Sequence, residues 1–197
     1  MGPMHGSLAP FYGLLTRRLQ RARLAAIAPH LASAGRVLDV GCGLTDLPAR
    51  LPAYVGCDRD PLVLSENRRR HPAARFVAWD VAADDAPAEL AGESFDVVLM
   101  AALLEHVPAP ARVLSRVAGL LAPGGRVVTT TPHPLGRLPL EAGARLGLLS
   151  SAADEEHETL LDRAALTAAG AGAGLALVSY GRFLVGLNQT AVFARAS

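Results

Sequence analysis

The chain has 197 residues, 51% of them hydrophobic, and a formal net charge of only +1. This length suits one domain with a substantial core, and the balance of apolar and charged residues excludes a disordered chain and gives no sign of a polyanion-binding one. The sequence has neither an uncharged apolar run of the roughly 18 residues that a membrane span needs nor a charged-then-apolar leader, so we expect a soluble cytoplasmic protein.

The first predicted element is an amphipathic helix from Phe11 to about Leu31. Apolar residues recur through it at helical spacing, opposite a set of arginines. The apolar positions are Leu14, Leu15, Leu19, Leu24, Ile27 and Leu31, and the arginines are Arg17, Arg18, Arg21 and Arg23. Such arginines are typical of a solvated face, with a substrate or membrane patch as the alternative.

Short apolar runs then alternate with helical segments, which predicts a parallel sheet with right-handed crossovers. The predicted strands are, in chain order, Val37–Val40, Tyr54–Cys57, Arg75–Trp79, Phe95–Met100 and Arg126–Thr131. The predicted helices between them are a short one near Asp46–Leu51, then Pro61–Arg70 and Ala109–Leu121, the last broken by Pro123-Gly124-Gly125.

The last part of the chain changes character at Pro132, because the prolines around His133 cannot continue a central strand. We expect an irregular or partly helical insertion over residues 132–158, then a helix over Asp162–Ala171. Two further strands, Leu175–Val185 and Thr190–Arg195, are joined by a short connection and therefore form an antiparallel pair. Asn188-Gln189 is predicted to lie in the turn between them.

The stretch from residue 37 to residue 60 carries the most chemical information. A first apolar strand runs into Gly41-Cys42-Gly43, and a second ends on Asp58. Glycines permit backbone conformations and close approaches that a β-carbon forbids, so the turn can press against a ligand. An acid ending the next strand lies beside that turn and can accept hydrogen bonds from ribose hydroxyls. The pattern predicts a nucleoside-containing cofactor, with an ordinary tight turn as the alternative.

The two cysteines, Cys42 and Cys57, end adjacent predicted strands. Buried reduced thiols are the expected state, ahead of a disulfide or a metal site.

With these motifs in order, the chain resembles the class I S-adenosylmethionine-dependent methyltransferases, with a motif pattern like that of small ubiquinone-type members. The segments that carry the resemblance are Val37–Gly43, Gly56-Cys57-Asp58, Val77–Val81, Phe95–Met100 followed by Leu104–Val107, and Leu121–Gly125. The resemblance implies a Rossmann-like α/β fold with a mostly parallel seven-stranded sheet of order 3-2-1-4-5-7-6, in which strand 7 is antiparallel and helices cover both faces.

The resemblance also implies a division of the chain and a cofactor site. A single methyltransferase domain would comprise a tail (1–10), an N-terminal helix (11–33), a cofactor-binding core (35–131), a substrate-side insertion (132–158) and a final helix and hairpin (159–197). S-adenosylmethionine would be the cofactor. The residues implied to bind it are Asp39, Gly41, Cys42, Gly43 and Leu44 at the first turn, Asp58 and Arg59 at the ribose, Asp80 and Val81 at the adenine, and Ala101 at the methionine ammonium.

The chain departs from the family at two places. Many members have a glycine where Thr45 stands, and Asp46 after it is unusual. Ubiquinone-type relatives carry a metal-binding Glu-x-x-Glu-His, but the first of these positions is Ala102 here, and Glu105-His106 remains. We therefore predict no catalytic metal.

Methyl transfer from a sulfonium chiefly requires that a nucleophile be held in line with the methyl group while water is excluded. An oxygen or nitrogen acceptor can also use a general base, for which histidine is well suited. His106, His133 and His157 are the candidates. A loop-capping structural role for His106 and a solvated acidic turn around His157 are the alternatives.

The sequence thus predicts a methyltransferase for a small or medium-sized acceptor, with oxygen the favoured accepting atom. An RNA or protein methyltransferase is a second possibility, although no basic aromatic surface supports nucleic-acid binding. A nicotinamide oxidoreductase is disfavoured because Asp46 interrupts the Gly-x-Gly-x-x-Gly pattern. A catalytically inactive cofactor-binding partner subunit is the remaining alternative. The sequence makes no prediction of oligomeric state.

Overall fold

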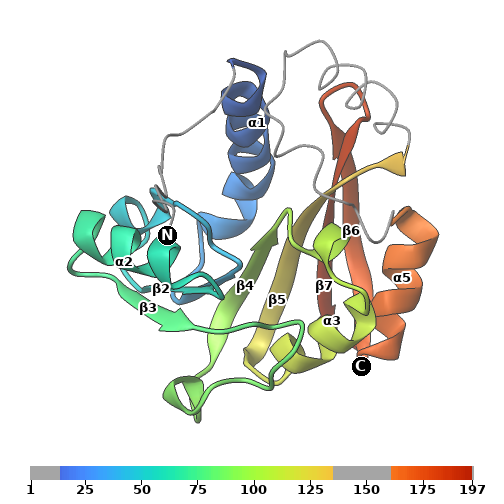
Figure 1. Ribbon diagram of the computed structural model, residues 1–197. Helices are drawn as coiled ribbons and strands as arrows, with labels where there is room; N and C mark the ends of the chain where they lie inside the picture. Colours follow the sequence, from blue (N-terminus) through green and yellow to red (C-terminus); the bar gives the residue numbers. More distant parts are fainter. Residues whose placement is uncertain (1–13, 135–160, 197) are drawn as a thin grey trace, which may run out of the picture.

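The computed structural model describes residues 14–134 and 161–196. A seven-stranded sheet in the order β3-β2-β1-β4-β5-β7-β6 forms its centre (Figure 1). The strands are β1 (Val37–Val40), β2 (Tyr54–Asp58), β3 (Arg75–Ala78), β4 (Phe95–Ala101), β5 (Leu121–Pro132), β6 (Leu175–Phe183) and β7 (Asn188–Arg195). Strands β1 to β5 pair in parallel, and β7 is antiparallel to both β5 and β6. The predicted sheet order is therefore confirmed.

The α-helices are α1 (Leu14–Leu31), α2 (Pro61–Arg70), α3 (Pro110–Ala118) and α5 (Arg163–Gly172). Short 3₁₀ turns lie at η1 (Leu47–Ala49), η2 (Ala88–Leu90) and η3 (Leu104–His106). Asp60 and Asp162 cap α2 and α5 by accepting a backbone N–H in the first turn, which satisfies donors that a helix start leaves unpaired.

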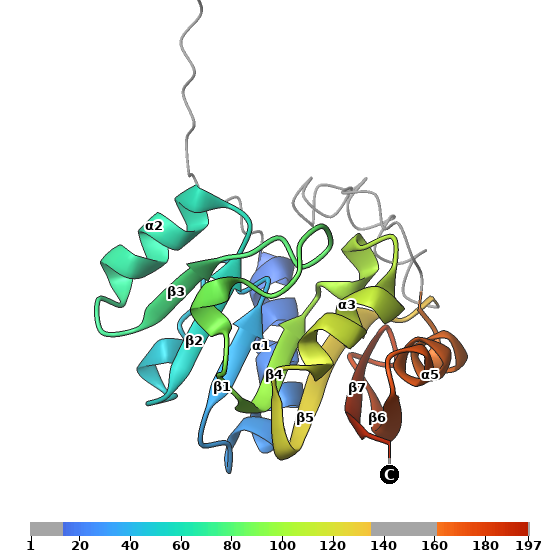
Figure 2. The same ribbon diagram turned by 90° about the horizontal axis from the view of Figure 1, so that it is seen from below.

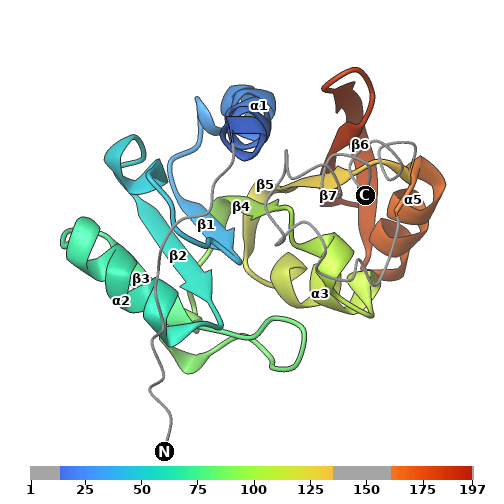
Figure 3. The ribbon, with the colours of Figure 1, turned by 45° about the horizontal axis from the view of Figure 1, so that its top comes forward.

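Helices cover both faces of the sheet, with α1 on one face and α3 beside α5 on the other (Figures 2 and 3). Ile27 and Leu31 of α1 and Leu64 of α2 pack with Val97, Leu99 and Val128 of the central strands in one apolar cluster. Val113, Leu114 and Val117 of α3 and Leu166 of α5 pack with Val98, Met100 and Phe193 in the other. The central strands are mostly apolar because both of their faces are buried.

Several predicted boundaries differ from the structure, most of all around β5 and near residues 46–51. The helix α3 ends at Ala118, and β5 begins at Leu121 because Leu121 is the sheet partner of Phe95. The register then jumps to Val97 and Arg126, so that Pro123-Gly124-Gly125 forms a bulge within the strand, with Gly124 at φ +74°. The short helix expected near Asp46–Leu51 is the single 3₁₀ turn η1.

The prediction that Asn188-Gln189 forms a turn is wrong. Both residues belong to β7, pair with Phe183 and Arg182 of β6, and are buried. The connection itself is made by Leu184 to Leu187, where Leu184, Val185 and Gly186 all have positive φ. The predicted insertion at residues 132–158 lies largely outside the described residues.

Candidate functional site

The turn after β1 presents backbone to the carboxyl edge of the sheet, where parallel α/β folds bind ligands. Gly41 has φ +69° and Gly43 has φ +52°, a region that disfavours side chains. A β-carbon on Gly41 would lie 2.9 Å from Leu103 Cδ1, whereas one on Gly43 would meet no atom within 4 Å. Gly41 is therefore favoured by its backbone conformation and lies against the Leu103 side chain, whereas Gly43 borders open space.

Asp58, the last residue of β2, is tied directly to that turn. Its Oδ2 accepts a 2.9 Å hydrogen bond from the Gly43 N–H, and its Oδ1 accepts one of 3.0 Å from the Asp60 N–H. The sequence predicts that Asp58 lies beside the glycine turn, and in the structure Asp58 contacts Gly43 of that turn. Each carboxylate oxygen has a second lone pair, so Asp58 retains acceptor capacity toward a ligand.

The glycine turn is also held by Asn67 of α2, which the sequence analysis did not single out. Asn67 of α2 is fully buried; its Nδ2 donates to the Gly43 carbonyl at 2.6 Å, and its Oδ1 accepts from the Thr45 N–H at 3.3 Å. A polar residue three positions after the buried Leu64, on the same helix face, was the available signal.

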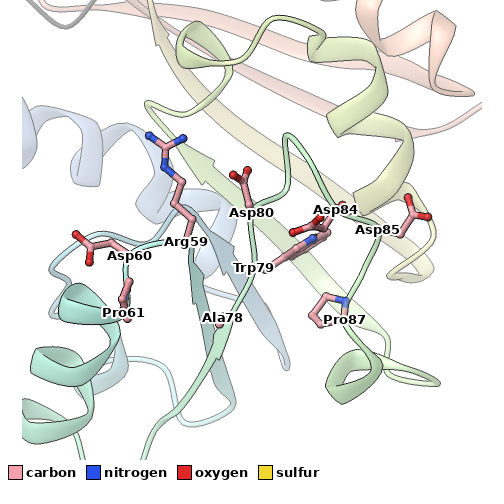
Figure 4. Close-up of a pocket in the computed structure, with 9 residues that line it drawn as sticks. All are labelled: Arg59, Asp60, Pro61, Ala78, Trp79, Asp80, Asp84, Asp85 and Pro87. Atoms are coloured by element: carbon pink, nitrogen blue, oxygen red, sulfur yellow. Dashed lines mark hydrogen bonds between the residues drawn. The ribbon is translucent and has the colours of Figure 1, made fainter.

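The loop after β3 forms the neighbouring part of this edge. Asp80 is half-buried, and its Oδ1 accepts a 3.0 Å bond from the Ala82 N–H. Asp80 and Arg59 line a cavity of about 710 Å³ between the ends of β2 and β3. Figure 4 shows the two side chains extending in the same direction from these adjacent strand ends. Val81, by contrast, buries its side chain in the apolar cluster beneath.

The remaining predicted residues near the first turn have internal partners. Asp39 is buried and accepts a 2.8 Å hydrogen bond from the Tyr54 hydroxyl. Burial raises the pKa of Asp39 to about 7, although the Tyr54 bond acts in the opposite direction. Leu44 is partly buried. Asp39 thus braces β1 against β2 from within the sheet.

The two cysteines are free thiols, and neither forms a disulfide. Burial raises the pKa of the Cys57 thiol to about 12, and burial together with Asp39 and Asp58 raises the pKa of Cys42 well above its ordinary value. Both are therefore protonated and unreactive near neutral pH. The Cys42 N–H donates to the Cys57 carbonyl at 2.9 Å, which links the ends of β1 and β2.

The carboxyl end of β4 leads into a polar corner. Ala101 ends the strand beside Thr130 of β5, and Ala102 follows with φ +57°, a strained value for a residue with a β-carbon. Glu105 is buried, and burial raises its pKa to about 7 despite the nearby Arg23 of α1. Glu105 Oε2 and Arg23 Nε are both buried with no hydrogen-bond partner. Sequence reasoning noted Glu105 only as a remnant of a metal motif and read Arg23 as solvated.

The two described candidate histidines, His106 and His133, occupy different places on this edge. His106 is exposed at the end of η3, whereas His133 is buried just after β5 and lines a second cavity, of about 850 Å³, with Arg163 and Arg182. Burial and the Arg182 charge lower the pKa of His133. His157 lies outside the described residues.

Gln189 of β7 binds residues on both sides of the gap between the two described parts of the chain. Its Nε2 donates to the Pro132 carbonyl at 3.2 Å and also to the Leu161 carbonyl, while its Oε1 accepts from the Tyr180 hydroxyl at 2.8 Å. Because the local sequence predicts a turn at this residue, its buried amide was not foreseen.

Neither metal ligation nor membrane spanning has support within the described part of the chain. No three metal-ligating side chains come together in residues 14–134 and 161–196. Among the same residues, no helix combines the length and the apolar character needed to cross a membrane. The absence of a catalytic metal stays a prediction.

A glycine turn, an acid ending the next strand and a 3-2-1-4-5-7-6 sheet define the class I methyltransferase architecture that the motifs resembled. The family described as "Methyltransferase domain" matches residues 13–180. The chain belongs to this family.

Curated relatives and solved structures are consistent with the assignment. The chain is 39% identical over 128 residues to the ubiquinone biosynthesis O-methyltransferase of Xanthomonas axonopodis pv. citri, a match covering 61% of this chain and 52% of that protein. It is 33% identical over 149 residues to the protein of the same name from Aeromonas salmonicida, covering 71% and 62%. The chain thus spans only about half to three fifths of these relatives. The magnesium protoporphyrin IX methyltransferase of Synechocystis PCC 6803, solved with bound SAH, shares the fold at a TM-score of 0.63 and 17% identity, with 91% and 83% coverage.

Proposed function

We propose that this protein is an S-adenosylmethionine-dependent methyltransferase that methylates an oxygen atom of a small or medium-sized acceptor. The observation that carries the proposal is the bond between the Asp58 carboxylate and the Gly43 N–H, which joins the acid ending β2 to the open glycine turn of β1. Membership of the methyltransferase family and the names of the curated relatives support the same reaction.

The described residues fit this cofactor. Gly43 has a left-handed backbone and open space where its β-carbon would be, so a ligand can lie against the main chain. Asp58 provides acceptors beside the turn for the ribose hydroxyls, and Asp80 does the same for the adenine amine. Residues 41–44 and the end of β4 at Ala101 would hold the methionine part by their backbone groups.

When bound, S-adenosylmethionine supplies an electrophilic methyl group on its sulfonium sulfur. The chain's own task is to hold the acceptor oxygen in line with that methyl group and to keep water out, which requires no covalent bond to the protein.

A histidine at the same edge would take the acceptor's proton. We assign this role to His133, because burial and the Arg182 charge lower its pKa and so keep the imidazole neutral at physiological pH. The more exposed His106 is the second candidate, and His157 is the third. All three stay predictions, as do the division of the chain into one methyltransferase domain and its cytoplasmic location.

Calorimetric titration tests the cofactor assignment. We expect binding of S-adenosylmethionine and of its product S-adenosylhomocysteine (SAH), and no binding of NADH. Binding of NADH alone would overturn the proposal.

Turnover with a panel of hydroxylated, amino and carboxylic acceptors tests the reaction. SAH release dependent on a hydroxylated acceptor is the expected result, and exclusive methylation of amines would overturn the choice of oxygen. Tight SAH binding without turnover on any acceptor would instead favour an inactive partner subunit.

A further inference from the structure

Arg116 of α3 reaches across to the loop that follows β3. Its Nη1 donates to the carbonyls of Val81 at 2.7 Å and Ala82 at 2.8 Å, and its Nη2 donates to the carbonyl of Ala83 at 2.8 Å. The side chain is only 7% exposed. One guanidinium thus binds three consecutive backbone carbonyls immediately after Asp80.

The rest of the loop is closed by short-range bonds around Asp80. The N–H groups of Ala83 and Asp84 donate to the Asp80 carbonyl at 3.1 and 2.8 Å, and the Ala82 N–H donates to the Asp80 carboxylate. These bonds give the loop a local shape but do not fasten it to the body of the protein. The Val81 side chain in the core and the buried Trp79, whose Nε1 donates to the Asp84 carbonyl at 3.2 Å, are two connections. Arg116 adds a third, directly to the loop backbone, from a helix anchored in the core by Val113, Leu114 and Val117.

The partners of Arg116 indicate that its main interaction is with the loop backbone rather than with a carboxylate. Its Nε lies 3.3 Å from Asp85 Oδ1, but the Asp85 side chain is 96% exposed, and such a pair contributes little in water. Hydrogen bonds from a buried guanidinium to carbonyls are stronger than this exposed ion pair. The planar guanidinium also has several N–H donors in a fixed arrangement, which a lysine ammonium lacks.

We propose that Arg116 is a positioning residue that sets the selectivity for adenine by fixing the loop on which Asp80 stands. The inference rests on the proposed function, in which Asp80 accepts a hydrogen bond from the adenine amine. Asp80 recognises that amine only while its carboxylate is held at the cavity it lines with Arg59. Releasing the carbonyls of residues 81–83 loosens the backbone next to Asp80, although the Val81 side chain stays in the core, so the carboxylate distinguishes a donor from an acceptor on the base less well.

The test compares two ligands that differ at one position of the base. SAH carries an amino group at position 6 of the purine, and S-inosylhomocysteine carries a carbonyl oxygen there. In the wild-type protein, we expect SAH to bind roughly 10- to 100-fold more tightly, since the carbonyl oxygen places an acceptor opposite the Asp80 carboxylate. Calorimetry measures both dissociation constants, and thermal unfolding by circular dichroism verifies that each variant is folded.

The variants are Arg116→Met, Arg116→Lys and the control Arg112→Met. Arg112 lies on the same helix and is exposed. Arg116→Met should weaken SAH binding by about tenfold or more and reduce the preference for SAH to within about threefold. Arg116→Lys should give an intermediate preference, because an ammonium replaces part of the bonding, and Arg112→Met should keep the wild-type preference.

The ratio of the dissociation constants for S-inosylhomocysteine and SAH, rather than the affinity for SAH alone, tests the inference. If the Arg116 variants lose affinity for both ligands equally and keep the wild-type preference, Arg116 is merely structural and the inference is wrong. If Arg116→Met does not fold, the preference of Arg116→Lys decides in the same way. Failure of the wild-type protein to bind SAH would be a different result, since it overturns the proposed function and the inference with it.

Discussion

Gly43 offers the most direct test of the proposal that the turn after β1 binds the cofactor, because the chain contains a matched control. Gly43 and Gly124 both have positive φ, +52° and +74°, and a β-carbon on either would meet no atom within 4 Å. Gly43 lies in the turn after β1, whereas Gly124 lies in the bulge of β5. Gly43→Ala and Gly124→Ala therefore impose a similar backbone strain at different places.

The expected loss of stability follows from the backbone alone. An alanine in the left-handed region costs roughly 1–2 kcal/mol, partly offset by the lower entropy of the unfolded chain, so each variant should lose about 1 kcal/mol. For a chain of this size, such a loss lowers the melting temperature by roughly 2–4 °C. Urea unfolding should give similar free energies for the two variants.

The affinity for SAH should separate them. The N–H that Gly43 donates to Asp58 remains in an alanine, so the substitution adds only a methyl group on the open side of the turn. If the cofactor lies there, Gly43→Ala should weaken SAH binding by about 30-fold, equivalent to roughly 2 kcal/mol, while Gly124→Ala should bind like the wild type. Binding of SAH to Gly43→Ala within about threefold of the wild type would refute the placement of the ligand against this turn.

Three further substitutions test neighbouring parts of the site. Asp58→Ala should weaken SAH binding roughly 10- to 100-fold by calorimetry while the circular dichroism spectrum is unchanged, and unaltered affinity would refute the ribose assignment. Asn67→Ala removes two hydrogen bonds to the glycine turn, so it should cost roughly 1–3 kcal/mol of stability by urea unfolding and also weaken SAH binding. The control is the neighbouring Glu66→Ala, which breaks an ion pair at the protein surface and should change neither stability nor SAH binding. Asp39→Asn tests the raised pKa of about 7. The unfolded chain ionises this carboxyl at about pH 4 while the native carboxyl stays protonated up to about pH 7, so the wild type loses stability across that range. The variant has no such group and should gain up to a few kcal/mol relative to wild type between about pH 4 and about pH 7, and a difference that is constant with pH would contradict the burial effect.

The strands were predictable because their signals are local, whereas their order was implied by the resemblance to the methyltransferase family. Continuous apolar runs such as 95–100 indicate strands buried on both faces, and the glycine turn with Asp58 indicates that β1 and β2 are neighbours. The start of β5 was not predictable in this way. Leu121 is a strand residue because Phe95 pairs with it across a bulge, and Pro123-Gly124-Gly125 read alone indicates only a turn.

The sequence-based predictions failed mainly for polar residues whose partners are buried and belong to other elements of the fold. Asn188-Gln189 has the composition of a turn, yet the Gln189 amide binds Tyr180 on the neighbouring strand and Pro132 and Leu161, which are distant in the chain. Arg116 looks like any solvated arginine at the edge of an apolar helix face until its three carbonyl partners are seen. Such partners depend on the fold and cannot be inferred from local pattern.

The departure at Thr45 shows how the fold accommodates a residue that the motif does not favour. Thr45 is buried; its N–H donates to Asn67, and its Oγ1 accepts from the Leu47 N–H at 3.1 Å, which starts the turn η1. His71 Nε2 lies 2.9 Å from the Thr45 carbonyl, so α2 binds the residue on both sides. A glycine would provide this turn by its own conformational freedom, whereas here side chains of a neighbouring helix hold it. The turn is therefore coupled to α2, and substitutions in that helix should change the affinity for the cofactor even where the substituted residue does not contact it.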